Sequence, residues 1–186
     1  MNKRYVNYDE FRGLTSDICR QITNSKWRPD YVVGITRGGL FPAVMASHYF
    51  RVPMHTLEIS LRDGSECESN CESNLWMAED AFGHVPMDQQ ELIHSRWDPS
   101  FRKNILIIDD INDSGATINW LLKDWPSGCH PKEEHVWQQV WNNNVRFATI
   151  FDNLNSKCQV KMDYAGEELD KQENDWIVFP YENWWV

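Results

Sequence analysis

ILIIDDINDSGAT, at residues 105–117, runs from four apolar residues directly into two adjacent acids. A short apolar run of this kind is typical of a strand that is buried on both faces. Asp109, Asp110 and Asp113 place three carboxylates close together where this strand ends. Because the burial of an unpaired carboxylate costs free energy, folding alone does not explain their presence. We therefore infer that this segment binds a ligand.

The residues after these acids are typical of a helix that begins over a phosphate group. We expect a helix over 114–125, whose first turn would favour an anion through its unpaired N–H groups and its dipole. Gly115 permits close approach of the backbone to a ligand. Adjacent acids beside a phosphate site suit the vicinal hydroxyls of a ribose and a Mg²⁺ ion. The segment thus predicts a site for a phosphorylated sugar.

A second loop of this type lies earlier in the chain. The apolar run YVVGI at 31–35 leads into TRGG at 36–39, and a helix over 40–50 and a strand over 54–60 are expected to follow. This order is typical of a βαβ unit in a parallel sheet, where ligands bind at the carboxyl ends of the strands. Arg37 offers charge-assisted hydrogen bonds to a second phosphate. A sugar with a phosphate at each end fits between the two loops.

The rest of the chain extends this α/β pattern, with one long interruption. Segment 7–25 has apolar residues at helical spacing, and Asn7 with Glu10 resembles a capping box at its start. A further strand is expected over 145–151. Residues 61–101 are polar, acidic and weakly periodic. A stretch of this length without regular structure is typically functional or disordered.

Composition excludes several classes of partner. The net charge of −10 argues against binding to nucleic acid, which needs a basic face. No apolar run approaches the roughly 20 residues that a membrane span needs, and the start of the chain has no signal-peptide core. The five cysteines form no regular framework, so we expect a cytoplasmic, reducing compartment. Cys67 and Cys71 lack a common zinc-site spacing, and we interpret them as free thiols of a surface loop.

Three motifs together resemble one family. ILIIDDINDSGAT resembles the phosphoribosyl-pyrophosphate signature of the type I phosphoribosyltransferases: an apolar strand, two acids, two spacer residues, an acid, a small hydroxyl residue and glycine. VVGITRGGLFPA, at 32–43, resembles the pyrophosphate loop of the family, with the Arg-Gly-Gly spacing of bacterial xanthine–guanine members. TIF at 149–151 and DWIVFPYE at 175–182 are similar to the last core strand and the purine-covering hood of that subfamily.

This resemblance implies an α/β type I phosphoribosyltransferase fold, in which helices flank a central, mainly parallel sheet. A single domain is expected, with its core at about 1–60 and 102–155. The flexible lid or insert would occupy about 61–101, where Arg62 is a candidate for contact with pyrophosphate, and the small hood about 156–186. Relatives of this kind form homodimers or homotetramers, and we expect the same here.

The implied reaction transfers 5-phosphoribosyl from phosphoribosyl pyrophosphate to guanine, xanthine or hypoxanthine and releases pyrophosphate, with Mg²⁺ as cofactor. In the family pattern, Asp109 and Asp110 hold the ribose hydroxyls and the metal, Asp110 lying nearest the ion. Asp113 is the catalytic base beside the purine N7. The resemblance further assigns the 5′-phosphate to Ser114, Gly115, Ala116 and Thr117, and the pyrophosphate to Thr36, Arg37 and Gly38, often with a strained or cis peptide bond in that loop.

The purine half of the site is predicted from fewer residues. The resemblance implies that Trp176 stacks on the base and that Ile177 offers it a backbone group, although Trp176 is equally compatible with core packing in a chain of ten tryptophans. Asn153 is the third purine-binding candidate, and it stands where purine-specific members have a lysine that donates to the 6-oxo group. An amide donates a weaker, neutral hydrogen bond.

Two alternatives belong to other classes of function. The departure at Asn153 and the unusual insert also suit a non-catalytic module that binds phosphoribosyl pyrophosphate or a nucleotide for regulation. A Mg²⁺-dependent phosphotransfer enzyme would use the paired acids directly, but it would need a nucleophile that the sequence does not show.

Overall fold

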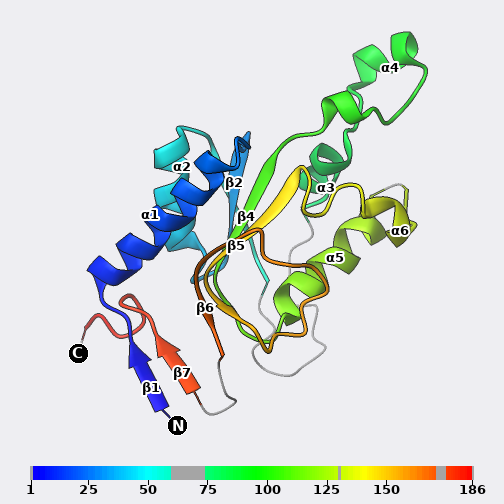
Figure 1. Ribbon diagram of the computed structural model, residues 1–186. Helices are drawn as coiled ribbons and strands as arrows, with labels where there is room; N and C mark the ends of the chain where they lie inside the picture. Colours follow the sequence, from blue (N-terminus) through cyan, green and yellow to red (C-terminus); the bar gives the residue numbers. More distant parts are fainter. Residues whose placement is uncertain (1, 60–73, 130, 171–174, 186) are drawn as a thin grey trace.

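The computed structural model describes residues 2–59, 74–129, 131–170 and 175–185. Its centre is a five-stranded sheet in the order β3-β2-β4-β5-β6, in which all neighbouring strands are parallel (Figure 1). The strands are β2 (Tyr31–Ile35), β3 (Met54–Leu57), β4 (Ile105–Asn112), β5 (Val145–Asn153) and β6 (Tyr164–Leu169). The parallel α/β fold predicted from the sequence is therefore confirmed.

Helices cover both faces of this sheet. α1 (Tyr8–Asn24) and α2 (Leu40–Phe50) lie on one face, and α3 (Leu75–Phe82), α5 (Ala116–Gly128) and the short α6 (Glu134–Trp137) lie on the other (Figure 1). Strand residues alternate between the two cores: Val33 and Ile107 pack with α3 and α5, whereas Val32 and Leu106 pack with α1 and α2. This alternation follows from the two-residue period of a strand. It explains why β2 and the first half of β4 are apolar without interruption.

The start of α1 agrees with the predicted cap only in part. The side chain of Asn7 accepts a hydrogen bond from the backbone N–H of Glu10, at 2.9 Å, and so satisfies one of the unpaired donors of the first turn. The side chain of Glu10 does not return to the Asn7 backbone, as a capping box requires. It pairs instead with Arg4.

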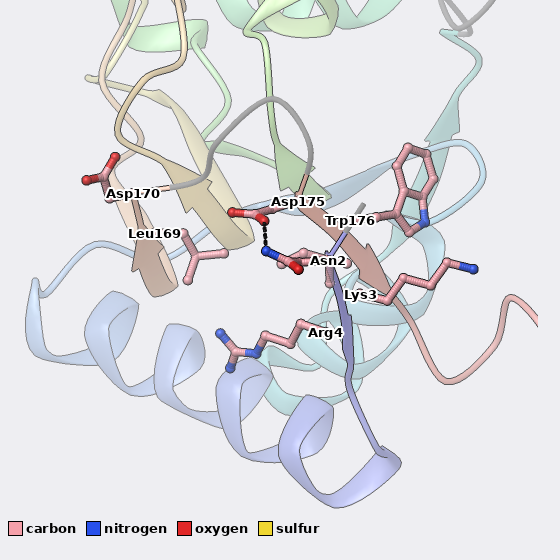
Figure 2. Close-up of a pocket in the computed structure, with 8 residues that line it drawn as sticks. Asn2, Lys3, Arg4, Leu169, Asp170, Asp175 and Trp176 are labelled. Carbon is pink, nitrogen blue, oxygen red and sulfur yellow. Dashed lines mark hydrogen bonds between the residues drawn. The ribbon is translucent and has the colours of Figure 1, made fainter.

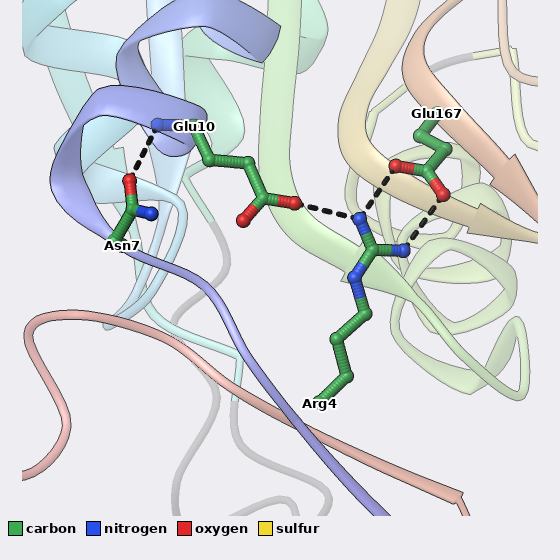
Figure 3. A network of polar contacts seen from close by, with 4 residues as sticks. All are labelled: Arg4, Asn7, Glu10 and Glu167. Atoms are coloured by element: carbon green, nitrogen blue, oxygen red, sulfur yellow. Dashed lines mark hydrogen bonds and ion pairs between the residues drawn. The ribbon is translucent and has the colours of Figure 1, made fainter.

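A second, two-stranded sheet joins the two ends of the chain. β1 (Asn2–Tyr5) pairs in parallel with β7 (Asp175–Val178), so the hood contains an N-terminal strand that the sequence analysis did not predict. Arg4 of β1 donates to both carboxylate oxygens of Glu167 on β6 and also to Glu10 on α1 (Figure 3). Its guanidinium also lies over the ring of Phe151 on β5. Arg4 thus ties the two-stranded sheet to the main domain.

Residues 75–101 differ from the structureless stretch that the sequence analysis expected. They form α3, α4 (Met87–Ile93) and a 3₁₀ turn (Pro99–Phe101), and α3 buries Met77, Ala78, Ala81 and Phe82 in the core. These apolar residues recur at helical spacing. The sequence analysis did not predict the helix because polar residues surround this short apolar pattern. α4 lies at the opposite end of the molecule from the β1–β7 pair (Figure 1). Residues 61–73 of the proposed lid, with Arg62, Cys67 and Cys71, lie outside the described residues.

Among the helices of the described ranges, none combines the length and the apolar character that crossing a bilayer would require.

The Arg4 contacts predict a measurable contribution to stability. We expect Arg4→Ala to lower the free energy of unfolding by about 1 kcal/mol, at the upper end of what partly exposed ion pairs contribute, because one guanidinium serves two carboxylates and a ring. Arg12→Ala is the matched control, since its pair with Asp9 is highly exposed. Urea unfolding of both variants measures the difference, and equal stability of the two would contradict the anchoring role.

This contribution should also depend on pH. The hydrogen bonds from Arg4 hold the pKa of Glu167 below its ordinary value of 4.5. A carboxyl whose pKa is lowered by folding stabilises the protein above its ordinary pKa, and this stabilisation is lost as the pH falls through the folded value. The stability difference between wild type and Arg4→Ala should therefore narrow below about pH 4.

Candidate functional site

The two predicted ligand loops meet at the carboxyl ends of β2 and β4. The peptide bond between Thr36 and Arg37 is cis, as the resemblance implied. A Cβ placed on Gly38 would lie 1.8 Å from Oδ2 of Asp110, and one placed on Gly39 would lie 2.5 Å from the backbone oxygen of Ile108. Only glycine permits the loop after β2 to approach β4 this closely.

Asp109 and Asp110 lie within β4 rather than after it, because the strand continues to Asn112. Asp109 is half-buried, and its Oδ1 accepts the backbone N–H of Asp110. Asp110 is only 5% exposed, and its Oδ2 accepts the hydroxyl of Tyr181 at 2.9 Å. The two acids thus differ in surroundings: one is near the surface of the site, and the other is enclosed between Gly38 and Tyr181.

The predicted phosphate loop has the expected helix start. α5 begins at Ala116, and Gly115 caps it with a φ of +82°, a conformation that favours glycine. A Cβ on Gly115 would also lie 2.3 Å from the backbone nitrogen of Cys158. The Ser114 carbonyl accepts the N–H of Lys157, while the Ser114 hydroxyl accepts the N–H of Ala116.

Asp113 and Asn153 face one another across neighbouring strands. β4 and β5 are paired through Asn112 and Asp152, so the next residue of each chain segment lies at the same level. The amide nitrogen of Asn153 donates to the backbone oxygen of Asp113 at 3.1 Å and to its Oδ1 at 3.2 Å. The Asn153 side-chain oxygen accepts the N–H of Asn155. The predicted contact of Asn153 with a purine stays a prediction.

Trp176 and Ile177 come from β7, and both line a pocket of about 260 Å³ (Figure 2). Trp176 is 42% exposed, whereas Ile177 is buried in the core shared with α1 and α2. A side chain this exposed is not part of the core, so core packing does not explain Trp176. Its stacking on a purine stays a prediction. The other lining residues are Asn2, Lys3, Arg4, Leu169, Asp170 and Asp175. Leu169 pairs in register with Asn153, so this pocket borders the end of β5.

No group of three or more histidine, cysteine or acidic side chains is arranged to hold a metal ion among the residues that the structure describes. The donor set of Asp109 and Asp110 nevertheless suits Mg²⁺, which commonly takes one or two carboxylates and completes its shell with water and substrate phosphates. Any such ion would depend on the bound substrate for part of its coordination.

Tyr181 contacts the site, although the sequence analysis did not identify it as a candidate. It is the seventh residue of the motif DWIVFPYE, in which the family resemblance assigned roles to Trp176 and Ile177 alone. Burial, followed by the nearby charge of Asp110, raises the pKa of Tyr181 above its usual range. Its hydroxyl is therefore protonated and can donate to the carboxylate. The sequence carried no sign that this ring reaches β4.

Comparison with known proteins adds independent information. Residues 4–183 match the family model described as a phosphoribosyl transferase domain. Xanthine-guanine phosphoribosyltransferase of Cereibacter sphaeroides is 26% identical over 86% of this chain and 71% of its own length. Xanthine phosphoribosyltransferase 1 of Saccharomyces cerevisiae is 20% identical over 66% of this chain, and the aligned part is 59% of the yeast protein.

Among solved structures, a purine phosphoribosyltransferase from Pyrococcus horikoshii has a similar fold. The TM-score is 0.60 at 20% identity, and the match covers 100% of this chain and 98% of that one. At this identity the similarity concerns the fold alone.

The close approach of Gly38 to Asp110 predicts a specific sensitivity to substitution. Gly38→Ala should lower the free energy of unfolding by about 1–3 kcal/mol, because the added methyl group overlaps the enclosed carboxylate. Gly13→Ala is the matched control: it lies in α1 with open space around it, and alanine is the better helix former. Thermal or urea unfolding measures both. If Gly38→Ala is as stable as Gly13→Ala, the two loops do not meet as described.

Proposed function

The chain belongs to the phosphoribosyl transferase domain family, and on that premise we propose that it transfers 5-phosphoribosyl from phosphoribosyl pyrophosphate to a purine base. The bond from C1 of the ribose to the pyrophosphate oxygen breaks, and a bond from C1 to a ring nitrogen of the base forms. The observation that carries this proposal is the contact between the Gly38 loop and Asp110, which joins the two predicted phosphate loops into one site.

We propose one orientation for phosphoribosyl pyrophosphate, with its 5′-phosphate at α5 and its pyrophosphate at the loop after β2. The first turn of α5 offers N–H groups from Gly115 onward to the 5′-phosphate, with the helix dipole favouring its charge. Asp109 and Asp110, in the C-terminal half of β4, receive the ribose hydroxyls as hydrogen-bond acceptors. Arg37, exposed in the loop after β2, is placed to neutralise the pyrophosphate. The ribose C1 then lies between the two loops.

Asp109 and Asp110 are also the residues that would hold Mg²⁺. When bound, the ion would neutralise charge on the pyrophosphate and make it a better leaving group. The task of these two carboxylates is to orient the hydroxyls and the ion together, which reduces the entropic cost of reaching the reactive geometry.

Asp113 is the candidate base for a proton of the purine. Asn153 donates to its carboxylate and to its backbone oxygen, so the side chain is held at the end of β4 before a ligand arrives. As the bond to pyrophosphate breaks, C1 gains oxocarbenium character, and a carboxylate that removes or shares a purine proton assists the attack by the ring nitrogen. In this scheme the main role of Asn153 is to position the general base Asp113, and direct recognition of the purine is secondary.

The purine class of acceptor is supported by the partly exposed Trp176 and by the names of the relatives. An indole face at the edge of a pocket suits a flat aromatic base. The proteins from C. sphaeroides and S. cerevisiae are named for xanthine, or for xanthine and guanine. We therefore propose guanine, xanthine or hypoxanthine as the acceptor.

Pyrophosphate release tests this proposal. Wild-type protein with phosphoribosyl pyrophosphate and Mg²⁺ is incubated with guanine, xanthine, hypoxanthine or adenine, and with no base as the control. We expect base-dependent release with at least one 6-oxopurine and formation of the matching nucleoside monophosphate. If the folded protein binds phosphoribosyl pyrophosphate but converts none of these bases, the proposed transferase activity is wrong. That result would favour the non-catalytic binding module.

Asp113→Ala separates catalysis from binding. Removal of a general base should lower kcat by about 10²–10⁴-fold, while the affinity for phosphoribosyl pyrophosphate changes little. Glu134→Ala, which removes an exposed acid on α6 outside the proposed lid and site, is the control and should behave like wild type. Steady-state kinetics and calorimetric titration of the donor provide the two readouts. An equal loss of rate and of donor affinity would make Asp113 a binding residue instead.

A further inference from the structure

We propose that Tyr181 is a positioning residue of the donor site, which holds the carboxylate of Asp110 in place for the ribose and the pyrophosphate. This inference rests on the proposed function, because Asp110 is assigned to the donor there. Tyr181 acts through Asp110 and is not itself placed against the substrate. It lies beyond β7, in the C-terminal part of the chain.

The contact is specific in its atoms. The Tyr181 hydroxyl donates to Oδ2 of Asp110 at 2.9 Å, across 71 positions of sequence. On its other side, the same oxygen faces Gly38, where a Cβ would lie at 1.8 Å. Asp110 therefore has one oxygen confined between the C-terminal segment and the loop after β2. A rotation of the carboxylate would have to break the hydrogen bond or enter the space of Gly38.

The ring of Tyr181 is fixed by aromatic neighbours. It stacks on Phe41 of α2 with ring centres 4.0 Å apart and planes 3° apart, and it is nearly parallel to Phe179 at 5.4 Å. The edge of Phe11 from α1 meets it at 5.7 Å and 84°. Rings held on several sides lose little further freedom when they form a hydrogen bond, so this donor is preorganised.

Binding of the donor does not require the Tyr181 contact to break. An ionised carboxylate has two oxygens and about four acceptor positions, so one oxygen can keep the tyrosine while the other receives a ribose hydroxyl. The rigid stacking favours this arrangement over an exchange of partners. Tyr181 also follows Trp176 in the same C-terminal segment, which links the donor half of the site to the candidate purine half.

Tyr181→Phe tests the inference, because it removes the hydroxyl and keeps the stacked ring. We expect the KM and the calorimetric Kd for phosphoribosyl pyrophosphate with Mg²⁺ to rise about tenfold, the scale of one hydrogen bond to a charged group. The kcat and the KM for the base should stay within about twofold of wild type. A general loss of structure would not divide the parameters in this way.

Tyr164→Phe is the matched control. The Tyr164 hydroxyl forms hydrogen bonds with Arg146 and Ser25 in a buried region on the α1 side of the sheet. Within the described part of the chain, neither of these partners belongs to the proposed site. Its donor KM should equal that of wild type, even if its melting temperature falls. The melting temperatures of both variants show whether each is folded under the assay conditions.

The outcomes separate this inference from the proposed function. If wild type binds the donor and Tyr181→Phe binds it equally well, the inference is wrong and the proposed function is untouched. If Tyr181→Phe and Tyr164→Phe lose affinity to the same degree, the effect is structural and the inference is also wrong. A wild-type protein that binds no phosphoribosyl pyrophosphate overturns both.

Discussion

The approach of the Gly38 backbone to the Asp110 carboxylate is the constraint on which the site depends. It requires glycine in the loop after β2, and it brings that loop against the end of β4. Because α5 begins shortly after the same strand, the turn at Gly115, for which we propose phosphate binding, is positioned by the same packing. In the proposed function, a ligand with phosphates at both ends contacts both loops while its sugar lies over the acids between them.

The elements that could be predicted best from the sequence are those determined by local patterns of residues. The apolar runs at 31–35 and 105–108 indicated buried strands, and α2 has the bounds 40–50 that were expected. The glycine and acid spacings of both loops placed these motifs at the carboxyl ends of parallel strands. Such features follow from short stretches of chain, in which side-chain period and turn residues determine the conformation.

The features that were missed depend on contacts between distant residues. Asn2–Tyr5 is short and polar, and it forms a strand only because β7 lies beside it. Tyr181 reaches Asp110 because Phe41 and Phe179 hold its ring. Asn153 could be recognised from the sequence as a departure from the family pattern. Its bond to Asp113 required the register of β4 and β5.

The central claim is that the two loops form one site for a phosphorylated ribose with a pyrophosphate at C1. Calorimetric titration of wild-type protein with phosphoribosyl pyrophosphate and Mg²⁺, compared with ribose 5-phosphate, tests it most directly. We predict saturable binding of the diphosphate, at least about tenfold tighter than that of ribose 5-phosphate, because the loop after β2 adds contacts to the pyrophosphate. Equal affinity for the two ligands, or no binding of either, would contradict the account.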